Sequence, residues 1–308
     1  MLGEIRGEVR FKEPLSFHTS LRIGGPADIF VVPQDVEDVR LALGFAERDH
    51  LPVEIIGGGN NLLVSDRGIR GVVVKVEGCL GRAEFHGEEA VAGAGVGLSA
   101  LIREAAALNL GGIECLVGIP ATIGGAVAMN AGTADGWISD FISAVYFLHP
   151  DGTLGEFKPG NRSFGYRDFA VPAGAVLVGA RLQLHRRPQA EIQKDMKQRL
   201  KVKKATQPLA LASVGCVWKN PHGENAARLI EKVGLKGKRL NGAEISAKHA
   251  NFIVNRGGAT APPAAAEPLA GHGHSGLGQV RQAATGGPAR RENASVTAHP
   301  SPSLILLP

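Results

Sequence analysis

The stretch Gly118-Ile119-Pro120-Ala121-Thr122-Ile123-Gly124-Gly125-Ala126-Val127-Ala128-Met129-Asn130-Ala131-Gly132 organises the rest of the chain. It is uncharged, and its four glycines and one proline predict a loop rather than a stable helix. Because Gly124 and Gly125 have no Cβ, the backbone there can come close to a flat ligand. Asn130 offers an amide to the polar edge of a ring. We therefore expect a ligand-binding loop.

A second glycine-rich run, Gly57-Gly58-Gly59-Asn60-Asn61, follows the apolar residues 53–56. Successive N–H groups of such a run can point into one concavity that suits a pyrophosphate. The following residues, 62–68, predict a short apolar run and a turn, with no helix. This differs from Rossmann and P-loop patterns, in which the phosphate loop opens a helix. Either loop alone is equally typical of an exposed turn, but together they favour a dinucleotide held by backbone groups.

Composition sets the protein class. The chain has 308 residues, 20% charged residues and a net charge of +5, which is ordinary for a soluble enzyme of two or three domains. The positive bias fits anionic ligands or simple surface solubility. Cys79, Cys115 and Cys216 lack the spacing of a metal site or redox pair, so we expect reduced thiols in the cytoplasm and no metal. Neither a membrane span nor a nucleic-acid-binding element is predicted.

Hydrophobic periodicity and turn residues predict an α+β protein. A helix capped by Asp35 and another beginning at Ser99 stand out, and residues 93–98 lack the last glycine of a nicotinamide-binding fingerprint. The predicted strands cover 29–32, 53–56, 72–76, 144–148, 153–157 and 176–184, and further helices cover 191–204 and 225–233. Residues 262–308 show no periodicity and are predicted to be disordered.

Six segments, taken in order, resemble the UDP-N-acetylenolpyruvoylglucosamine reductase family over roughly residues 14–261. They are residues 19–27, 57–63, 118–132, 163–168, 215–221 and 249–255. The resemblance implies an FAD-binding domain of the vanillyl-alcohol-oxidase (PCMH) type in two subdomains, followed by a C-terminal α+β substrate domain. The implied boundaries are 1–78, 79–204 and 205–261, with an aberrant tail at 262–308. The short spacing from Arg167 to Val176 resembles the type II form.

The implied activity is an NADPH-dependent, FAD-mediated reduction of UDP-N-acetyl-enolpyruvoylglucosamine to UDP-N-acetylmuramate, in peptidoglycan precursor synthesis. FAD is expected to be bound non-covalently, and the protein to act as a monomer without nucleic-acid or membrane partners. The implied FAD contacts are Gly57, Gly58, Gly59, Asn60, Asn61, Leu62, Gly118, Ile119, Pro120, Thr122, Gly124, Gly125, Asn130 and Ala131.

Two residues match catalytic positions of the family. Arg167 stands where an arginine faces the substrate carboxylate, on which negative charge grows after hydride transfer; an ion pair with Asp168 is the alternative. Cys216 stands where many members have a proton-donating serine, and a thiol gives up its proton more readily than a hydroxyl. The alternative for Cys216 is a buried apolar cysteine. The implied substrate contacts are Tyr166, Lys204, Lys219 and Asn220.

One departure affects activity. The family ends with a strand whose glutamate completes the catalytic set, and no such segment follows Ala261; Glu267 and Glu292 lie in unrelated contexts. A reading-frame change is one hypothesis for this break. We expect FAD binding to survive better than turnover. The remaining alternatives are another FAD-dependent oxidoreductase of the same superfamily and a flavin-binding protein without turnover.

Overall fold

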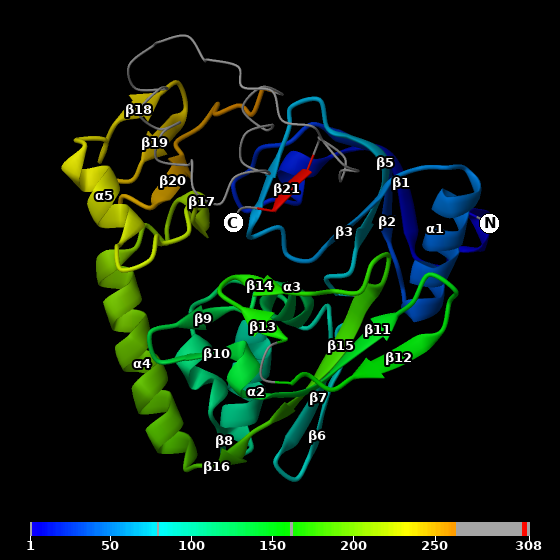
Figure 1. Ribbon diagram of the computed structural model, residues 1–308, viewed down its shortest axis with the longest axis horizontal. Helices are drawn as coiled ribbons and strands as arrows, with labels where there is room; N and C mark the ends of the chain where they lie inside the picture. Colours follow the sequence, from blue (N-terminus) through cyan, green and yellow to red (C-terminus); the bar gives the residue numbers. More distant parts are fainter. Residues whose placement is uncertain (1, 79, 161–162, 263–303, 307–308) are drawn as a thin grey trace. The chain divides into compact units, whose positions relative to one another are not determined.

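The structure is a computed structural model that describes residues 2–78, 80–160, 163–262 and 304–306. It divides into two compact units (Figure 1). Unit 1 comprises Met1–Glu13, Asp28–Gly58 and Gly71–Ala205, and unit 2 comprises Pro14–Ala27, Gly59–Arg70 and Thr206–Pro308. Cys79 and most of the tail that we predicted to be disordered lie outside the described residues. The four segments implied by the resemblance remain predictions.

A four-stranded sheet opens the chain, in the order β1-β2-β5-β3. Its strands are β1 (Glu8–Pro14), β2 (Pro26–Val32), β5 (Ile69–Lys75) and β3 (Val53–Ile56), and β3 runs parallel to β5. Helix α1 (Val36–Arg48) begins at Asp35, whose carboxylate accepts hydrogen bonds from the N–H groups of Glu37 and Asp38. The predicted cap is therefore confirmed. Alternation along β5 buries Val72 and Val74 in the same core as α1.

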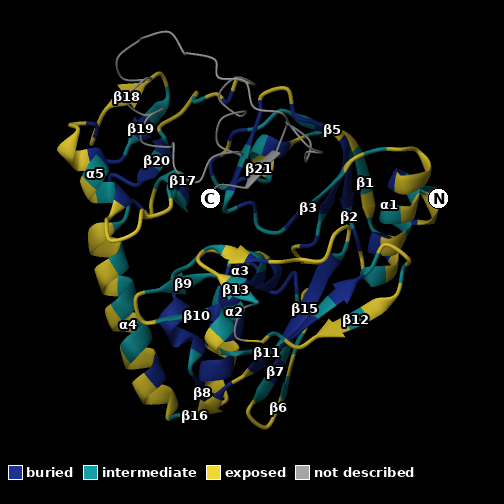
Figure 2. Ribbon diagram, viewed as in Figure 1, coloured by how far each residue is buried: buried dark blue, intermediate teal, exposed yellow. Residues whose placement is uncertain are grey.

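The second layer of unit 1 is a five-stranded antiparallel sheet, in the order β12-β11-β15-β7-β6. Its strands are β12 (Leu154–Phe157), β11 (Ile142–Leu148), β15 (Val176–Gln183), β7 (Glu89–Gly93) and β6 (Ala83–His86). Three helices accompany it: α2 (Leu98–Ala107), α3 (Ile123–Ala128) and α4 (Gln189–Thr206). The apolar faces of α2 and α3 share the core of this sheet, drawn dark blue in Figure 2.

Short elements complete unit 1. Three antiparallel pairs are β8 (Leu110–Gly111) with β16 (His185–Arg186), β9 (Gly132–Thr133) with β10 (Gly136–Trp137), and β13 (Phe164–Gly165) with β14 (Asp168–Phe169). Single 3-10 turns are η1 (Leu2–Glu4), η3 (Ile113–Leu116) and η4 (Ile138–Asp140). The β11–β12 hairpin confirms the predicted turn at Asp151 and Gly152.

Unit 2 contains a four-stranded sheet in the order β17-β20-β19-β18. Its strands are β17 (Ala212–Cys216), β20 (Phe252–Asn255), β19 (Ala243–Ile245) and β18 (Arg239–Leu240), and it also holds α5 (Ala226–Lys232) and η2 (Leu15–Phe17). Strand β4 (Leu62–Val64) pairs antiparallel with β21 (Leu304–Leu306), a strand within the tail for which the sequence predicted no element. Helices with largely antiparallel sheets confirm the α+β class.

The prediction that glycines keep residues 118–132 from forming a helix is wrong for six of them. Residues Ile123–Ala128 form α3, although the helix contains Gly124 and Gly125. Thr122 caps it, because its hydroxyl accepts a hydrogen bond from the N–H of Gly125 at 3.3 Å. Tertiary packing offsets the poor helix propensity, since Ile123, Ala126 and Val127 are buried.

Candidate functional site

The two glycine-rich loops meet inside unit 1. Gly57 directly follows β3, and a Cβ placed on it would overlap the hydroxyl oxygen of Thr122 at the start of α3. Gly124 in turn lies on Ala94, where an added Cβ would sit 3.0 Å from the alanine Cβ. Glycine at these two positions lets the backbone segments approach without a side chain between them. The sequence predicted that both loops serve one ligand, and the structure places the loops in contact at Gly57 and Thr122.

The beginning of the loop at 118–132 is anchored by α4. The Lys203 ammonium donates a hydrogen bond to the carbonyl of Val117 at 2.7 Å, and burial lowers the Lys203 pKa. A Cβ on Gly118 would lie 3.0 Å from the Lys203 side chain, so the helix and the loop are in close contact. Sequence analysis named Lys204 as a substrate contact; its side chain is exposed on α4, one residue beyond this anchor.

The predicted FAD contacts within unit 1 differ in exposure. Pro120 and Gly125 are exposed, Gly57, Gly58, Gly118, Ile119 and Ala131 are half-buried, and Thr122, Gly124 and Asn130 are buried. Asn130, which we expected to meet a ring edge, donates from its side-chain Nδ2 to the carbonyl of Gly165 at 2.9 Å. Its Oδ1 accepts from the N–H of Ser139 at 3.3 Å. The amide thus joins the loop to the segment that carries Tyr166 and Arg167.

Arg167 lies on the turn between β13 and β14. Both strands of this hairpin are labelled in Figure 1. Arg167 has a left-handed backbone, with φ of 53°, which is uncommon for a non-glycine residue and frequent at functional sites. Phe164 and Phe169 stack at 4.4 Å between ring centroids and hold the two strands together. Tyr166, which is exposed, meets the ring of Trp137 edge-on at 5.9 Å. Arg167 therefore lies on a turn whose two strands are packed together through Phe164 and Phe169.

The second half of the first glycine run belongs to unit 2. A Cβ on Gly59, which has a φ of 63°, would overlap the carbonyl of His18, and the carbonyl of Gly59 accepts from the N–H of Ser20 at 3.0 Å. Asn60 and Asn61 are half-buried, and the buried Leu62 begins β4. No helix follows this run, as predicted from the apolar residues and the turn at 62–68.

Cys216 is a half-buried cysteine at the end of β17 in unit 2. The pairing register with β20 shifts between Ser213 and Cys216, and Gly215 has a φ of 80°. A bulge of this kind re-aims the side chain that follows it. Lys219 and Asn220 are exposed, and the Asn220 Oδ1 accepts from the N–H of Ala226 at the start of α5. A fully buried structural cysteine, the alternative reading, does not fit this exposure.

Sequence reasoning missed three residues that support these loops. Asn251, 3% exposed, bonds both the N–H and the carbonyl of Trp218 and so fixes the loop after Cys216. Lys203 anchors the glycine-rich loop, and Trp137 supports Tyr166. Of these three, only Lys203 had a signal in the sequence that could have identified it. It follows Leu200 by three residues and so shares its helical face, and Leu200 packs on the core.

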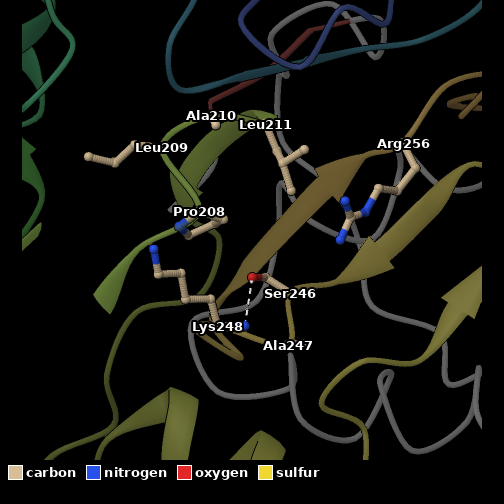
Figure 3. Close-up of a pocket in the computed structure, with 8 residues that line it drawn as sticks. All are labelled: Pro208, Leu209, Ala210, Leu211, Ser246, Ala247, Lys248 and Arg256. Carbon is tan, nitrogen blue, oxygen red and sulfur yellow. Dashed lines mark hydrogen bonds between the residues drawn. The ribbon is translucent and has the colours of Figure 1, made fainter. Parts of the chain in front are cut away.

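Two hollows lie among the described residues, and the second has Lys203 in its lining. One, of about 290 Å³, is lined by Pro208, Leu209, Ala210, Leu211, Ser246, Ala247, Lys248 and Arg256 (Figure 3). Its Arg256 guanidinium is already paired with both carboxylate oxygens of Glu244 at 3.0 Å, so it is a poor anion receptor. The other, of about 340 Å³, is lined by residues of η3, α4 and the β9–β10 turn, among them Cys115 and Arg199. Burial raises the pKa of Cys115 to about 11, so this thiol is protonated.

The described ranges contain neither a metal-ligand cluster nor a membrane-spanning helix. His, Cys, Asp and Glu side chains there form no group of three that could hold a metal ion. None of the helices in the same ranges has the length and apolar character needed to cross a bilayer.

The residues fit FAD. Within the described part of the chain, the backbone N–H groups of Gly57 and Gly58 donate no hydrogen bond, and both residues are half-buried. Such amides in a glycine turn suit the oxygens of a pyrophosphate. Gly125 is exposed, and an added Cβ there would meet only the Thr122 hydroxyl, at 3.5 Å, so a flat ring has room to approach.

Comparison with known proteins agrees with this geometry. Residues 27–158 match the family model described as FAD binding domain, and residues 207–266 match that of the UDP-N-acetylenolpyruvoylglucosamine reductase C-terminal domain. The chain thus carries an FAD-binding domain of the predicted type, followed by the C-terminal domain of this reductase.

Full-length relatives extend the match. The UDP-N-acetylenolpyruvoylglucosamine reductase of Desulfosudis oleivorans is 41% identical over 269 residues, 83% of this chain and 86% of the relative. That of Anaeromyxobacter is 44% identical over 83% of this chain and 80% of its own length. The crystal structure of the Thermus caldophilus enzyme superposes with a TM-score of 0.73 at 38% identity, covering 83% of this chain and 91% of that one. The chain belongs to the UDP-N-acetylenolpyruvoylglucosamine reductase family.

Proposed function

We propose that this protein reduces UDP-N-acetyl-enolpyruvoylglucosamine to UDP-N-acetylmuramate, with NADPH as reductant and FAD as non-covalent cofactor, in peptidoglycan precursor synthesis. Family membership supports the activity. The observation within the chain that carries it is a guanidinium on a strained turn that is tied directly to the glycine-rich loop. The reaction adds a hydride to C3 of the enol ether and a proton to C2, which gives the lactyl ether.

FAD, when bound, supplies the hydride that NADPH provides. The amides of Gly57 and Gly58 would hold its pyrophosphate, and the loop around Gly124 and Gly125 would lie against its ring system. The other cofactor contacts of this proposal are Gly59, Asn60, Asn61, Leu62, Gly118, Ile119, Pro120, Thr122 and Ala131, together with the backbone of Asn130, whose side chain is bonded to Gly165 and Ser139. The protein would bind FAD mainly through backbone groups, and their arrangement is set by the packing of Gly57 on Thr122 and of Gly124 on Ala94.

Arg167 binds the substrate carboxylate in this proposal. Negative charge moves onto that carboxylate as the hydride reaches C3, and a planar guanidinium can meet both oxygens at once. A flexible surface side chain would lose much of this effect, since preorganised charges cost no reorganisation during the reaction. Its position on a packed hairpin turn supports the role over that of a structural ion pair with the exposed Asp168.

Cys216 delivers the proton to C2. Its thiol stands at a bulge at the end of β17, half-buried, directly before the loop that Asn251 fixes. Tyr166, Lys204, Lys219 and Asn220 contact the sugar nucleotide, whose diphosphate suits the two lysines. The protein would act as a monomer in the cytoplasm, where NADPH and the nucleotide are dissolved.

Turnover is proposed to be slower than in relatives with the family's C-terminal glutamate. Glu267 and Glu292 stand in other sequence contexts, and both lie outside the described residues. Loss of one general-acid or electrostatic contributor costs on the order of 10²–10⁴ in rate. FAD binding depends on loops in other parts of the chain and should remain.

An absorbance titration of the purified protein tests the whole proposal. NADPH should bleach the flavin band, and the enolpyruvyl sugar nucleotide should restore it under anaerobic conditions with formation of the lactyl ether. Restoration by an alcohol or lactone, and not by the sugar nucleotide, would assign the protein to another FAD-dependent oxidoreductase activity. Bound flavin with a nucleotide-induced spectral change and no product would leave a binding protein without turnover.

A further inference from the structure

Asn130 occupies a special position after α3. It is the first residue beyond the helix C-cap, Met129, and has a left-handed backbone with φ of 41°. Its side chain is buried, with 6% of the residue exposed. A buried amide must have its hydrogen bonds satisfied, or its desolvation costs stability. The structure satisfies this amide with two backbone groups of two different segments, Gly165 and Ser139.

The partner segments both belong to the surroundings of the Arg167 turn. Gly165 is the residue of β13 that pairs with Asp168 across the hairpin. Ser139 lies in η4, which follows directly on Trp137, and Trp137 meets Tyr166 edge-on. The indole also covers Gly132, where an added Cβ would overlap the ring. Asn130 therefore lies between the glycine-rich loop and the turn that carries Tyr166 and Arg167.

We propose that Asn130 is a positioning residue, which sets Arg167 at the right place relative to the glycine-rich loop. The inference rests on the proposed function and concerns how the same site is held. One hydrogen bond from Nδ2 fixes the carbonyl of Gly165, two residues before Arg167. The left-handed backbone at Arg167 is costly unless its surroundings hold it. A displacement of the guanidinium by about 1 Å can cost up to 10²-fold in rate.

This role separates the two halves of the catalytic cycle. Reduction of FAD by NADPH does not require a cation at the enolpyruvyl carboxylate, whereas reoxidation by the sugar nucleotide does. A loss of Arg167 placement should therefore slow the second half alone. A merely structural role for Asn130 would weaken FAD binding and slow both halves together.

Asn130→Gly tests the proposal, because glycine keeps the left-handed backbone and removes only the amide. Asn109→Gly is the matched control: Asn109 also follows a helix C-cap, has a φ of 58°, and accepts from a backbone N–H, that of Gln189, at 3.0 Å. Asn130→Asp is a second variant. Its carboxylate keeps an acceptor for Ser139 and loses the donor to Gly165.

Full-length variants with bound FAD would be compared by anaerobic stopped-flow absorbance. For Asn130→Gly and Asn130→Asp, reoxidation by the sugar nucleotide should slow by about tenfold or more, and reduction by NADPH should stay within about twofold. Asn109→Gly should leave both rates within about twofold. Equal slowing of both half-reactions by Asn130→Gly, or no slowing, overturns the proposal.

Amide hydrogen exchange gives a readout that needs no turnover. Peptides that cover residues 164–169 should exchange about fivefold faster or more in Asn130→Gly than in the wild type or Asn109→Gly. Unchanged exchange there means that Asn130 does not hold the turn, and refutes the inference. If the wild-type protein shows no reoxidation by the sugar nucleotide, the proposed function fails, and the exchange result still decides whether the tether exists.

Discussion

Replacement of Gly57 by alanine tests whether the two glycine-rich loops form one packed unit. The new Cβ would lie closer than 3.0 Å to the Thr122 hydroxyl oxygen, yet at 3.5 Å from the Thr122 Cβ and Cγ2. The carbon atoms are thus in ordinary contact, and only the hydroxyl overlaps. Either the loops separate or the hydroxyl rotates away.

Both responses cost stability. Overpacking in a tight contact costs about 1–3 kcal/mol. Rotation of the hydroxyl gives up its hydrogen bond to the N–H of Gly125 and leaves α3 without its cap, which costs about 1 kcal/mol. Because only one of the two responses occurs, we expect Gly57→Ala to lower the free energy of unfolding by about 1–3 kcal/mol. FAD affinity should fall by about tenfold or more, because the cradle between the loops opens.

The Thr122→Ala background isolates the cause. Thr122→Ala alone loses the cap, at about 1 kcal/mol, and removes the overlapping atom. Adding Gly57→Ala to it should then cost little, which gives a coupling of about 1–3 kcal/mol between the two sites. Gly44→Ala is the control, since nothing lies within 4 Å of a Cβ there and the site is inside α1. It should stabilise the protein by about 0.5–1 kcal/mol and leave FAD binding unchanged.

Denaturant titration of the apoprotein and fluorescence titration with FAD measure the two effects. The reasoning is refuted if Gly57→Ala binds FAD as tightly as the wild type. It is equally refuted if the cost of Gly57→Ala is the same with and without the Thr122 hydroxyl, since the overlap with that one atom is then not the cause.

Three further perturbations address the chemistry and one titrating group. Arg167→Lys should slow flavin reoxidation by the sugar nucleotide by about 10²-fold, as a point charge replaces the planar fork, while NADPH reduces FAD at the wild-type rate; equal rates in both half-reactions would remove Arg167 from the mechanism. Cys216→Ala should lower product formation by about 10²–10⁴-fold, and Cys216→Ser should retain most of it; an alanine variant as fast as the serine variant would exclude the thiol as donor. Burial raises the pKa of Glu54 on β3 from 4.5 to about 7, so the folded state holds a proton that the unfolded state has lost. The buried Glu54 carboxyl does not destabilise the fold below about pH 4.5, and its destabilising effect grows as pH rises through 7. Glu54→Gln should therefore stabilise the protein by about 1–2 kcal/mol at pH 8 and little at pH 4.5, measured by thermal unfolding. The same gain at both pH values would contradict the shift.

Local signals in the sequence were sufficient where one segment determines its own structure. Asp35 caps α1 through the N–H groups of Glu37 and Asp38, within one turn of chain. No helix follows the run at 57–61, as the short apolar run and the turn at residues 62–68 indicated. Such features need no knowledge of the remaining fold, because the donor and the acceptor are neighbours in sequence.

Contacts between residues far apart in the sequence could not be predicted in this way. The six-residue helix α3 exists against its glycine content, because Thr122 caps it and the protein core covers one side. The bond of the Asn130 amide to the carbonyl of Gly165, 35 residues later, was not foreseen, because nothing in the sequence brings these two segments together. The contact between Lys203 and the carbonyl of Val117 was likewise missed, because the phase of α4 relative to the core decides which lysine turns inward. Lys204 stays a proposed substrate contact.

The glycines of the loop at 118–132 divide into two groups once their surroundings are known. Gly124 is required by the protein itself, since a Cβ would press on Ala94. Gly125 is exposed, and a Cβ there would make only ordinary contact with Thr122, so packing within the chain gives no reason for glycine. A glycine inside a helix costs about 0.5–1 kcal/mol relative to alanine. Under the proposed function, close approach of FAD to the exposed side of α3 would give Gly125 the reason for glycine that packing within the chain does not supply.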